Sequence, residues 1–465
     1  MRPVTRILGI ALLALLTGCG DSRPNLLLVT IDTLRADRLE CYGGPPGIGH
    51  RLCELGAEGT RFEWAFSTAP STSPSVASLL TSLHVPDHRV TQNLESTLPD
   101  EALSVAEVLG EAGYATAAFV SNPMLHRVRR MNQGFDVYDH RMQRREPNRP
   151  GYAERNAAET TQAALAWART KPPEPWFLWV HYQDPHGPYL PPGTGPVRDP
   201  DNGRRLPVLE NDSGRGGIPR YQALPGLASP EAYEQLYRAE IAQLDAQFEA
   251  LVDGLDALGA PPAILVTADH GEAFGEDGYW FAHGHSAGID QIRVPLLFRP
   301  APGSRGKGVA PEPVSLVDVA PTLLALAGTQ VPQAFVGRAL AVHAGDTPAA
   351  ERPLFVEASR QAAVVVGRDY YARDRHPGAT VSSEGRAWGD ENPALPARTT
   401  TLRPGGTAAR YETVTAPRAP LEDALAAYLE EHPLTDTPPA DDRARGEVPG
   451  ALRDQLRALG YDSDE

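Results

Sequence analysis

Four hydroxyl side chains stand close together in STAPSTSPSVASLLTS, residues 67–82. They belong to Ser71, Thr72, Ser73 and Ser75, which surround Pro74. An apolar run with helical spacing begins at Val76, so the hydroxyls lie at a junction between a loop and a helix. Hydroxyls at such a junction either cap the helix by accepting hydrogen bonds from its first amides or present a nucleophile to a bound anion. The stretch alone leaves both interpretations open.

Acidic and imidazole side chains directly follow three short apolar runs elsewhere in the chain. NLLLVTID ends in Asp32, PWFLWVHYQDPH carries His181, Asp184 and His186, and AILVTADH ends in Asp269 and His270. Short apolar runs predict buried parallel strands, whose carboxyl ends meet at one edge of a sheet. Carboxylates and imidazoles are common ligands of divalent cations. We therefore expect a metal site at this edge, with the glycine-rich AHGHS loop that carries His283 and His285 beside it.

Helices are expected between these strands. Ser229 and Pro230 have the composition of a helix start, and apolar residues then recur at spacings of three and four as far as Leu258, before Gly259. The stretch 103–121 reads as a helix, a stop at Gly113 and a strand. Strands that alternate with helices predict an α/β domain with a mainly parallel sheet.

Two regions are less regular. Residues 190–228 are rich in Pro, Gly and Arg, and we expect a long surface loop near the site. Beyond about residue 350, PLFVEAS, AAVVVG and DYYAR predict short strands of a smaller sheet. Residues 374–413 stay unassigned, and LRDQLRALGY near the end predicts a short amphipathic helix.

The first residues have the composition of an export signal. Arg2 and Arg6 precede an apolar run, and Leu16-Thr17-Gly18-Cys19 resembles the lipobox of bacterial lipoproteins. We expect a signal peptide over 1–18, lipidation of Cys19, and a tether over 19–24. No later stretch has the length and apolarity of a membrane span, so we expect an exported lipoprotein on the periplasmic or cell-surface face of a membrane, held by its lipid anchor only.

Charge and cysteine usage limit the partners. The 465 residues carry a formal net charge of −16, and no basic patch stands out, so we expect no nucleic-acid partner. Cys41 and Cys53 either form a disulfide or remain separate buried thiols, and both alternatives stay open.

Six blocks of the chain resemble, in order, the signature blocks of the sulfatase family in the alkaline phosphatase superfamily. They are NLLLVTIDTLRADRLECYG, STSPSVASLLTS, FLWVHYQDPHGPY, LVTADHGEAFGEDG, HGHSAGIDQIRVPLLF and VSLVDVAPTLLALAG, within residues 25–340. The resemblance implies a large mixed sheet between helices over 25–345 and a smaller C-terminal sheet with a diverged tail over 346–465. It also implies an ester hydrolase.

The resemblance carries roles to individual residues. Asp32, Asp269 and His270 match metal ligands. His186 matches a histidine that contacts the ester or its leaving group. His285 lies near the position of a substrate-binding lysine and is expected to be catalytic, with His283 as the rival because the alignment is good to about one residue.

Further contacts are expected around these residues. His181, Asp184 and His283 are expected to contact substrate. Asp184 with His186 or His285 is a candidate pair for a second metal site.

The nucleophile position departs from the family's pattern. Sulfatases oxidise a Cys or Ser two residues before the proline of a Cys/Ser-x-Pro-x-Arg motif, and here Thr72 and Val76 stand in place of the Cys/Ser and the Arg. Threonine cannot form that aldehyde, because its β-carbon already carries a methyl. Threonine resembles instead the phosphodiesterase and phosphate-transferase branches, in which a metal-bound threonine attacks phosphorus.

The sequence therefore predicts a metal-dependent hydrolase of sulfate or phosphate esters. Asp32, Thr72, Asp269 and His270 would hold zinc, manganese or calcium, and Thr33 stands where many sulfatases carry a second aspartate. The substrate is expected to be an anionic ester, with a glycan or a lipid head group as its remainder. A transferase of phosphoryl head groups on the same scaffold and a binding lipoprotein without catalysis are the alternatives.

Overall fold

The computed structural model describes residues 23–93, 96–145, 153–193, 195–201, 203–259, 261–348, 350–359, 361–375, 397–403, 412–413 and 419–432. The expected leader, Cys19 and the helix expected in LRDQLRALGY lie outside these residues.

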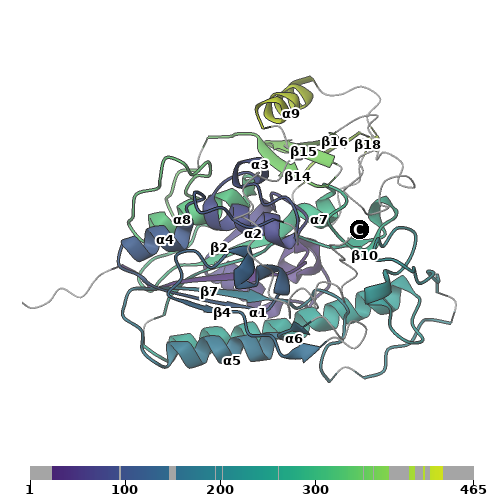
Figure 1. Ribbon diagram of the computed structural model, residues 1–465, viewed down its shortest axis with the longest axis horizontal. Coiled ribbons are helices and arrows are strands. Elements are labelled where there is room, and N and C mark those ends of the chain that lie inside the picture. The colour runs from purple at the N-terminus through teal and green to yellow at the C-terminus, as the bar shows by residue number, and fades with distance from the viewer. Residues whose placement is uncertain are drawn as a thin grey trace, which may run out of the picture.

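A nine-stranded sheet forms the centre of the molecule (Figure 1). Its strands are β1 (Leu26–Ile31), β2 (Thr60–Phe66), β3 (Ala115–Val120), β4 (Val137–Asp139), β7 (Trp176–Tyr182), β8 (Ala263–Ala268), β11 (Arg293–Arg299), β12 (Gly308–Ala310) and β13 (Val314–Ser315). Their order is β12-β2-β11-β8-β1-β7-β3-β4, and β13 also pairs with β2. Strands β8, β1, β7, β3 and β4 are parallel, whereas β11 is antiparallel to both neighbours. The expected large, mixed and mainly parallel sheet is confirmed.

Helices cover both faces of this sheet. They are α1 (His50–Glu58), α2 (Thr72–Thr81), α3 (Val85–His88), α4 (Val105–Glu111), α5 (Ala157–Ala168), α6 (Pro230–Asp256), α7 (Ile289–Ile292), α8 (Val319–Leu326) and α9 (Ala419–Glu431). Helices α1, α5 and α6 lie below the sheet in Figure 1, and α2, α4 and α8 lie above it. Because both faces are covered, the central strands are apolar throughout, and all six residues of β1 are buried.

The long helix α6 begins where the sequence suggested but ends earlier than expected. The Ser229 side chain accepts a hydrogen bond from the amide of Ala232, with Pro230 in the first turn. The helix ends at Asp256, so Leu258 lies beyond it and is 44% exposed rather than part of the apolar stripe. Gly259 follows in the left-handed region, with a φ of 92°.

Short elements complete the connections. The two-stranded pairs are β5 (Arg144–Arg145) with β6 (Ala153–Glu154) and β9 (Ala273–Phe274) with β10 (Trp280–Ala282). Short 3₁₀ turns lie at Ala36–Arg38, Glu40–Tyr42, Pro123–Leu125, Arg127–Arg129, Arg220–Gln222, Glu276–Gly278 and Leu316–Asp318. As expected, the described part of 190–228 is mostly irregular, with one of these turns and a single isolated bridge between Val208 and Ile218.

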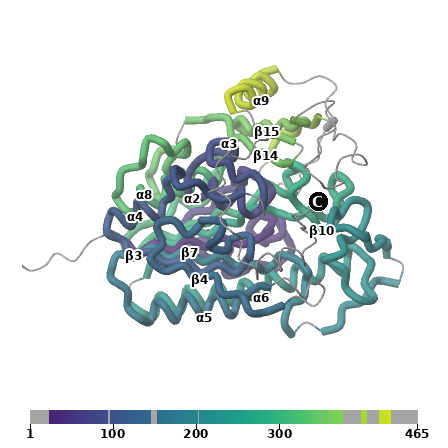
Figure 2. Tube along the Cα trace, in the orientation of Figure 1, coloured from purple at the N-terminus to yellow at the C-terminus, as the bar shows by residue number. Residues whose placement is uncertain are grey.

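A separate five-stranded antiparallel sheet follows the main domain, which confirms the expected smaller C-terminal sheet. Its strands, in spatial and chain order, are β14 (Leu354–Glu357), β15 (Gln361–Val366), β16 (Asp369–Asp374), β17 (Arg398–Thr401) and β18 (Glu412–Thr413). Helix α9 covers one face of this sheet (Figure 2) through Leu421, Leu425 and Tyr428. The other face shares a core with Trp64 and Phe66 of β2.

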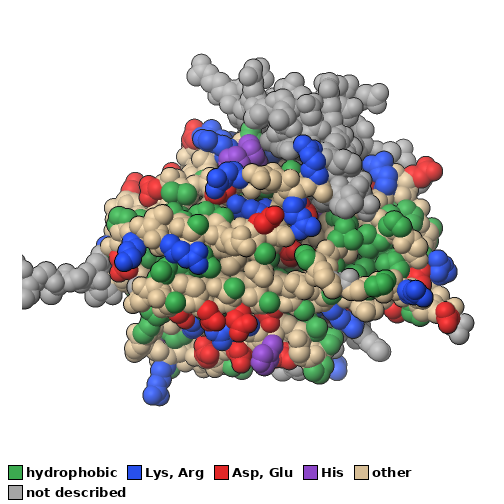
Figure 3. Space-filling model, turned by 90° about the horizontal axis from the view of Figure 1, so that it is seen from below, with side chains coloured by type: hydrophobic (Ala, Val, Ile, Leu, Met, Phe, Trp, Pro, Cys, Tyr) green, Lys and Arg blue, Asp and Glu red, His purple; other side chains and the backbone are tan. Residues whose placement is uncertain are grey.

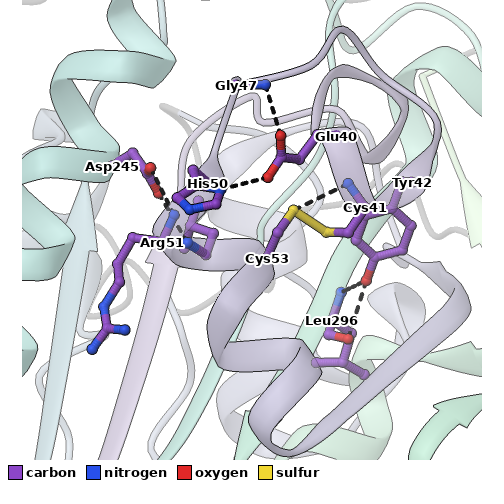
Figure 4. Close-up of a disulfide and its surroundings, with 10 residues drawn as sticks. Glu40, Cys41, Tyr42, Gly47, His50, Arg51, Cys53, Asp245 and Leu296 are labelled. Carbon is purple, nitrogen blue, oxygen red and sulfur yellow. Dashed lines mark hydrogen bonds and ion pairs between the residues drawn. A yellow bond between two sulfur atoms is a disulfide. The ribbon is translucent and has the colours of Figure 1, made fainter.

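Cys41 and Cys53 form a disulfide, which settles the alternative that the sequence left open. The bond joins the turn after β1 to helix α1 (Figure 4). Beside it, Glu40 accepts hydrogen bonds from the His50 ring and from the amide of Gly47. The cross-link fixes the segment that leaves the end of β1.

The face seen from below in Figure 3 carries a group of acidic side chains, in keeping with the net charge of −16. Within the described residues, no helix combines the length and the apolarity needed to cross a membrane.

Candidate active site

Strand register brings the first two candidate ligands together. Ile31 at the end of β1 pairs with Ala268 at the end of β8, so Asp32 and Asp269 leave the sheet side by side. Both side chains are fully buried. The prediction that acids after neighbouring parallel strands converge at one edge is therefore confirmed for this pair.

Each of these carboxylates has one oxygen held by the protein and one oxygen turned away from these donors. Asp269 Oδ1 accepts hydrogen bonds from the amides of Thr33 at 3.2 Å and His270 at 2.7 Å. Asp32 Oδ2 accepts one from the Asn122 side-chain amide. Asp32 Oδ1 and Asp269 Oδ2 are buried and have no hydrogen-bond partner among the described residues. Buried carboxylate oxygens without partners are costly, so these two oxygens indicate a place for a cation.

His270 directs one ring nitrogen to the same place. Its Nδ1 lies 2.9 Å from the carbonyl oxygen of Gly271, so Nδ1 carries the proton and Nε2 presents a lone pair. Nε2 lies 3.6 Å from Asp32 Oδ1 and 3.6 Å from Asp269 Oδ2. A ligand atom from each of the three residues lies within 4.8 Å of the others.

These spacings fit a divalent cation. Metal–ligand bonds of about 2.1 Å in a tetrahedral site separate neighbouring ligand atoms by about 3.4 Å, close to the distances around His270 Nε2. Thr72 Oγ1 lies 3.4 Å from that nitrogen and completes a set of four. The expected set of Asp32, Thr72, Asp269 and His270 thus lies together, with two carboxylates, one imidazole and one hydroxyl.

The electrostatics of the cluster agree with this fit. Burial raises the pKa of Asp32 well above its ordinary value, and burial together with the Asp32 charge raises the pKa of Asp269 to about 6. Burial lowers the pKa of His270 to about 4, so its ring is neutral near pH 7. Two close carboxylates and a neutral imidazole are unfavourable without a counter-charge, and a cation between them would supply it.

Thr72 is the first residue of helix α2, which ends at Thr81. The N-cap residue Ser71 makes no side-chain capping bond, and Ser73 Oγ donates to the carbonyls of Asn93 and Met124. The hydroxyl cluster is therefore not engaged in capping. Thr72 Oγ1 instead faces His270 at the positive end of a ten-residue helix, where an anion is favoured.

His283, and not His285, faces this cluster. The His283 ring centre lies 4.4 Å from that of His270. Its Nδ1 lies 3.1 Å from Oε1 of the buried Glu272, which fixes the ring orientation. His285 instead stacks on Tyr279, at 4.7 Å between ring centres, and burial lowers its pKa to about 3. The structure thus places the rival His283, and not His285, beside the cluster, because the loop at Gly284 turns the two rings apart.

His186 lies on the other side of His283. Their ring centres are 5.4 Å apart, and His186 also stacks on Tyr221 from the 190–228 segment at 6.2 Å. The expectation that this segment reaches the site is confirmed by that contact. His186 Nδ1 lies 2.7 Å from the carbonyl oxygen of Gly187.

Two expected substrate contacts lie elsewhere. Strand β7 continues to Tyr182, so His181 is a strand residue, and its Nε2 lies 3.7 Å from Asp32 Oδ2, the oxygen that Asn122 already holds. His181 therefore lies next to Asp32 on the side of the sheet, without a hydrogen bond to it, and its Nδ1 is held by Thr30 Oγ1 at 2.7 Å. Asp184 lies beside the buried Glu240 in a small cavity that His186 also lines, and burial raises the pKa of both carboxyls. Neither Asp184 with His186 nor Asp184 with His285 belongs to a group of three or more possible metal ligands among the described residues.

Asn122 and Glu272 are site residues that sequence reasoning missed. Asn122 follows the apolar strand β3, the same signal that singles out Asp32, but an amide after a strand indicates a metal site less strongly than an acid does. Glu272 stands two residues after His270 and reads as part of the same motif. Thr33 has a φ of 57°, which is rare for a β-branched residue, and this conformation turns its amide to Asp269.

Comparisons with known proteins agree with this geometry. The model of the Sulfatase family matches residues 24–329. The ulvan-active sulfatase of Formosa agariphila is 25% identical over 375 residues, which cover 73% of this chain and 70% of that protein. A solved 2-O GAG sulfatase has a TM-score of 0.65 and 19% identity, with 92% of this chain and 97% of the other covered.

A second similar structure is the phosphonate monoester hydrolase of Silicibacter pomeroyi, with a TM-score of 0.64, 20% identity, and 88% and 94% of the two chains covered. These likenesses under 25% identity show a shared fold. The family match covers more than half of the chain and includes every residue of the cluster. The chain belongs to the sulfatase family of ester hydrolases.

Proposed function

We propose that this chain hydrolyses sulfate or phosphate esters with Thr72 as its nucleophile and a divalent cation at Asp32, Asp269 and His270. The observation that carries the proposal is the position of Thr72 Oγ1, 3.4 Å from His270 Nε2 at the start of α2. A hydroxyl that only capped the helix would point to the helix amides, and the N-cap residue of α2 makes no such side-chain bond.

The four ligand groups define what the site would take. A divalent cation held there would lower the pKa of the Thr72 hydroxyl and offset the negative charge of the ester oxygens. The mixed oxygen and nitrogen set, with four groups in reach, favours zinc or manganese over calcium, which takes six to eight oxygen ligands. A cation held there would also be the partner that Asp32 Oδ1 and Asp269 Oδ2 lack among the described residues.

The residues of the chain then divide the reaction between them. Thr72 Oγ1, as the alkoxide, forms a bond to the phosphorus or sulfur atom while the bond to the leaving oxygen breaks. His283 protonates the leaving oxygen, because Glu272 holds its Nδ1 and so leaves Nε2 for the substrate. In the second step His283 removes a proton from water, which attacks the same centre and releases Thr72. His186 lies beside His283, where the leaving group would pass.

Phosphate diesters should be better substrates than aryl sulfates. A threonine cannot supply the hydrated aldehyde with which sulfatases expel sulfate, whereas an alkoxide beside a cation can attack phosphorus directly. The relatives are sulfatases, and the same fold also carries a phosphonate monoester hydrolase, so both ester classes belong in one test.

The deciding experiment is a panel of aryl sulfate, phosphate monoester and phosphate diester substrates, each assayed with zinc, manganese and calcium. Wild type, Thr72→Ala and Thr72→Ser are compared at equal metal content. We expect Thr72→Ala to lose at least about 10³-fold in kcat and Thr72→Ser to keep part of the activity. The cost of Thr72→Ala in stability should stay near 1 kcal/mol or below, about the size of a lost cap. Full activity of Thr72→Ala on every ester would show that Thr72 is not the nucleophile.

We also propose that the chain is exported as a lipoprotein through Cys19. The disulfide between Cys41 and Cys53 supports this, because such bonds persist mainly in oxidising compartments. Mass spectrometry of the mature N-terminus tests the proposal. Cleavage at another residue, or release of the protein from membranes by high salt alone, would contradict it.

A further inference from the structure

The small C-terminal sheet holds the loop that directly follows His283. This loop, residues 284–288, is here called the histidine loop, and its backbone groups contact side chains from three segments of the small sheet. Ser359 Oγ donates to the carbonyl of Gly284 at 3.0 Å, and Tyr370 OH donates to that of Ala287 at 2.5 Å. The amide of Ala287 donates to Gln361 Oε1 at 3.2 Å. The loop is thus bound along its length by a sheet that contributes no residue to the metal cluster.

Arg398 on β17 joins these contacts. Its guanidinium donates to Ser286 Oγ at 2.6 Å, to Gln361 Oε1 at 3.2 Å, and to Asp277. Ser286 Oγ in turn donates to Asp277 Oδ2 at 2.9 Å and accepts from the amide of Gly288 at 3.0 Å. Arg398 is only 4% exposed, so its charge depends on these partners.

The packing around Gly288 shows how closely the guanidinium approaches the loop. A Cβ on Gly288 would lie 3.3 Å from Arg398 Nη2 and still closer to Asp290 Oδ1. A side chain at this position would have to displace these groups, although the backbone conformation of Gly288 is open to any residue. Arg398 thus reaches the loop both by this close approach and through Ser286 Oγ, which accepts from the Arg398 guanidinium and from the amide of Gly288, so a change at Arg398 should alter the loop.

The same loop touches the nucleophile segment at its other end. A Cβ on Gly284 would lie 3.4 Å from Ser71 Oγ and 3.8 Å from the carbonyl oxygen of Pro70. Gly284 is also the residue after His283, and its φ of 88° is the turn that separates the His283 ring from that of His285. A loop fixed at Ser286 to Gly288 therefore fixes where His283 stands relative to His270 and Thr72.

We infer that Arg398 is a positioning residue for the active site, which acts on His283 through Ser286, Asp277 and the histidine loop. The inference rests on the proposed role of His283 in protonating the leaving group. It assigns the C-terminal sheet a part in the reaction, as the element that holds this proton donor in place.

The test uses the full chain and compares Arg398→Gln with Arg375→Gln. Arg375 is a matched control, because it is also a buried arginine of the small sheet, 8% exposed, and its partner is Glu357 rather than the histidine loop. Hydrogen–deuterium exchange followed by mass spectrometry is measured on the peptide that contains the amides of Ala287 and Gly288. We expect at least about tenfold faster exchange in Arg398→Gln and no change in Arg375→Gln. Equal exchange in the two variants would overturn the inference, whatever the enzyme hydrolyses.

Kinetics then connect the loop to His283. On an alkyl phosphate diester, whose leaving group needs a proton, Arg398→Gln should lower kcat about tenfold, and Arg398→Lys should recover part of the loss. On a p-nitrophenyl diester, whose leaving group needs little protonation, the loss should be less than about threefold.

A double variant separates positioning from general stability. In a His283→Ala background, Arg398→Gln should change kcat by less than about twofold. An equal loss in both backgrounds would mean that Arg398 acts on general stability and would refute the positioning role. If the wild type hydrolyses no ester of the panel, the proposed function fails, while the exchange experiment still decides whether Arg398 holds the loop.

Discussion

The candidate active site consists of two parts that are built in different ways. The metal cluster lies at the ends of β1 and β8 and at the start of α2, and its four residues are at most 1% exposed. The histidine part, with His186 and His283, lies on loops after β7 and after β10. Strand register fixes the metal cluster. The histidine part is held by hydrogen bonds from the Glu272 side chain and from side chains of the small sheet.

The difference suggests that the two parts of the site serve different purposes. Register leaves Asp32 and Asp269 only one relative position, which suits a cation whose ligand distances tolerate little change. Loops can change length and sequence without disturbing the sheet, which suits contacts to a leaving group that differs between substrates. Four predictions test whether the two parts are as separate as this comparison holds.

The largest effect should come from Asp269→Asn. The change keeps the size of the side chain but removes the charge that Oδ2 directs into the cluster. We expect loss of bound metal and a decrease in kcat of at least about 10³-fold. Metal content after gel filtration, measured by mass spectrometry, together with the diester assay checks this. Full metal occupancy in the variant would contradict the assignment of Asp269 as a metal ligand.

His283→Ala should have a smaller effect of another kind. We expect full metal content and a decrease in kcat of about 10²-fold on substrates with poor leaving groups, the usual contribution of a general acid. The control is His285→Ala, which removes the ring stacked on Tyr279. Loss of metal in His283→Ala would show that the two parts are not separate.

Asn122→Ala tests how far a neighbour of the metal ligands contributes to metal binding. The variant leaves every proposed ligand in place but removes the donor to Asp32 Oδ2. We expect metal affinity to fall by about tenfold, at the low end of the range for partners of metal ligands, because His181 still faces the same oxygen. Competition with a chelator of known affinity measures the change, and an unchanged affinity would contradict it.

The smallest effect should be a pH dependence of the stabilisation by metal. In the metal-free protein the pKa of Asp269 is raised to about 6, so its contribution to stability is present at low pH and is lost as the pH rises through 6. Metal binding needs the ionised carboxylate, and protons compete with the metal below that pH. The increase in Tm on adding metal should therefore be a few degrees larger at about pH 7.5 than at about pH 5. An increase that is larger at the lower pH would be inconsistent with Asp269 as a ligand.

The sequence predicts the first part of the site better than the second for a physical reason. An apolar run followed by an acid implies a strand end, and parallel strand ends share one edge, so Asp32, Asp269 and His270 can be placed together without coordinates. The apolar run before His181 ends at Val180, whereas β7 continues to Tyr182. Because of that difference, the sequence predicts that His181 contacts substrate, whereas in the structure His181 lies next to Asp32.

The choice between His283 and His285 depends on a left-handed glycine between them and on hydrogen bonds from residues far along the chain, such as Ser359 with Gly284. No local pattern contains that information. The same holds for Arg398, which stands in a stretch with little hydrophobic periodicity. Such contacts depend on tertiary packing, and they cannot be predicted from the sequence around each residue alone.

The place of β1 in the sheet also constrains how the chain reaches its native state during synthesis. This strand is made first, yet its neighbours arrive much later, since Leu26 pairs with Phe177 and with Ala263. Its purple trace lies inside the molecule, among teal and green segments of later sequence (Figure 2). At about 5–20 residues per second, the growing chain carries an unpaired apolar segment for roughly ten seconds or longer before β8 emerges. The nascent protein therefore passes through a period in which β1 is open to aggregation, and a holdase chaperone that covers its first strand should raise the yield of folded enzyme more than one that acts after release.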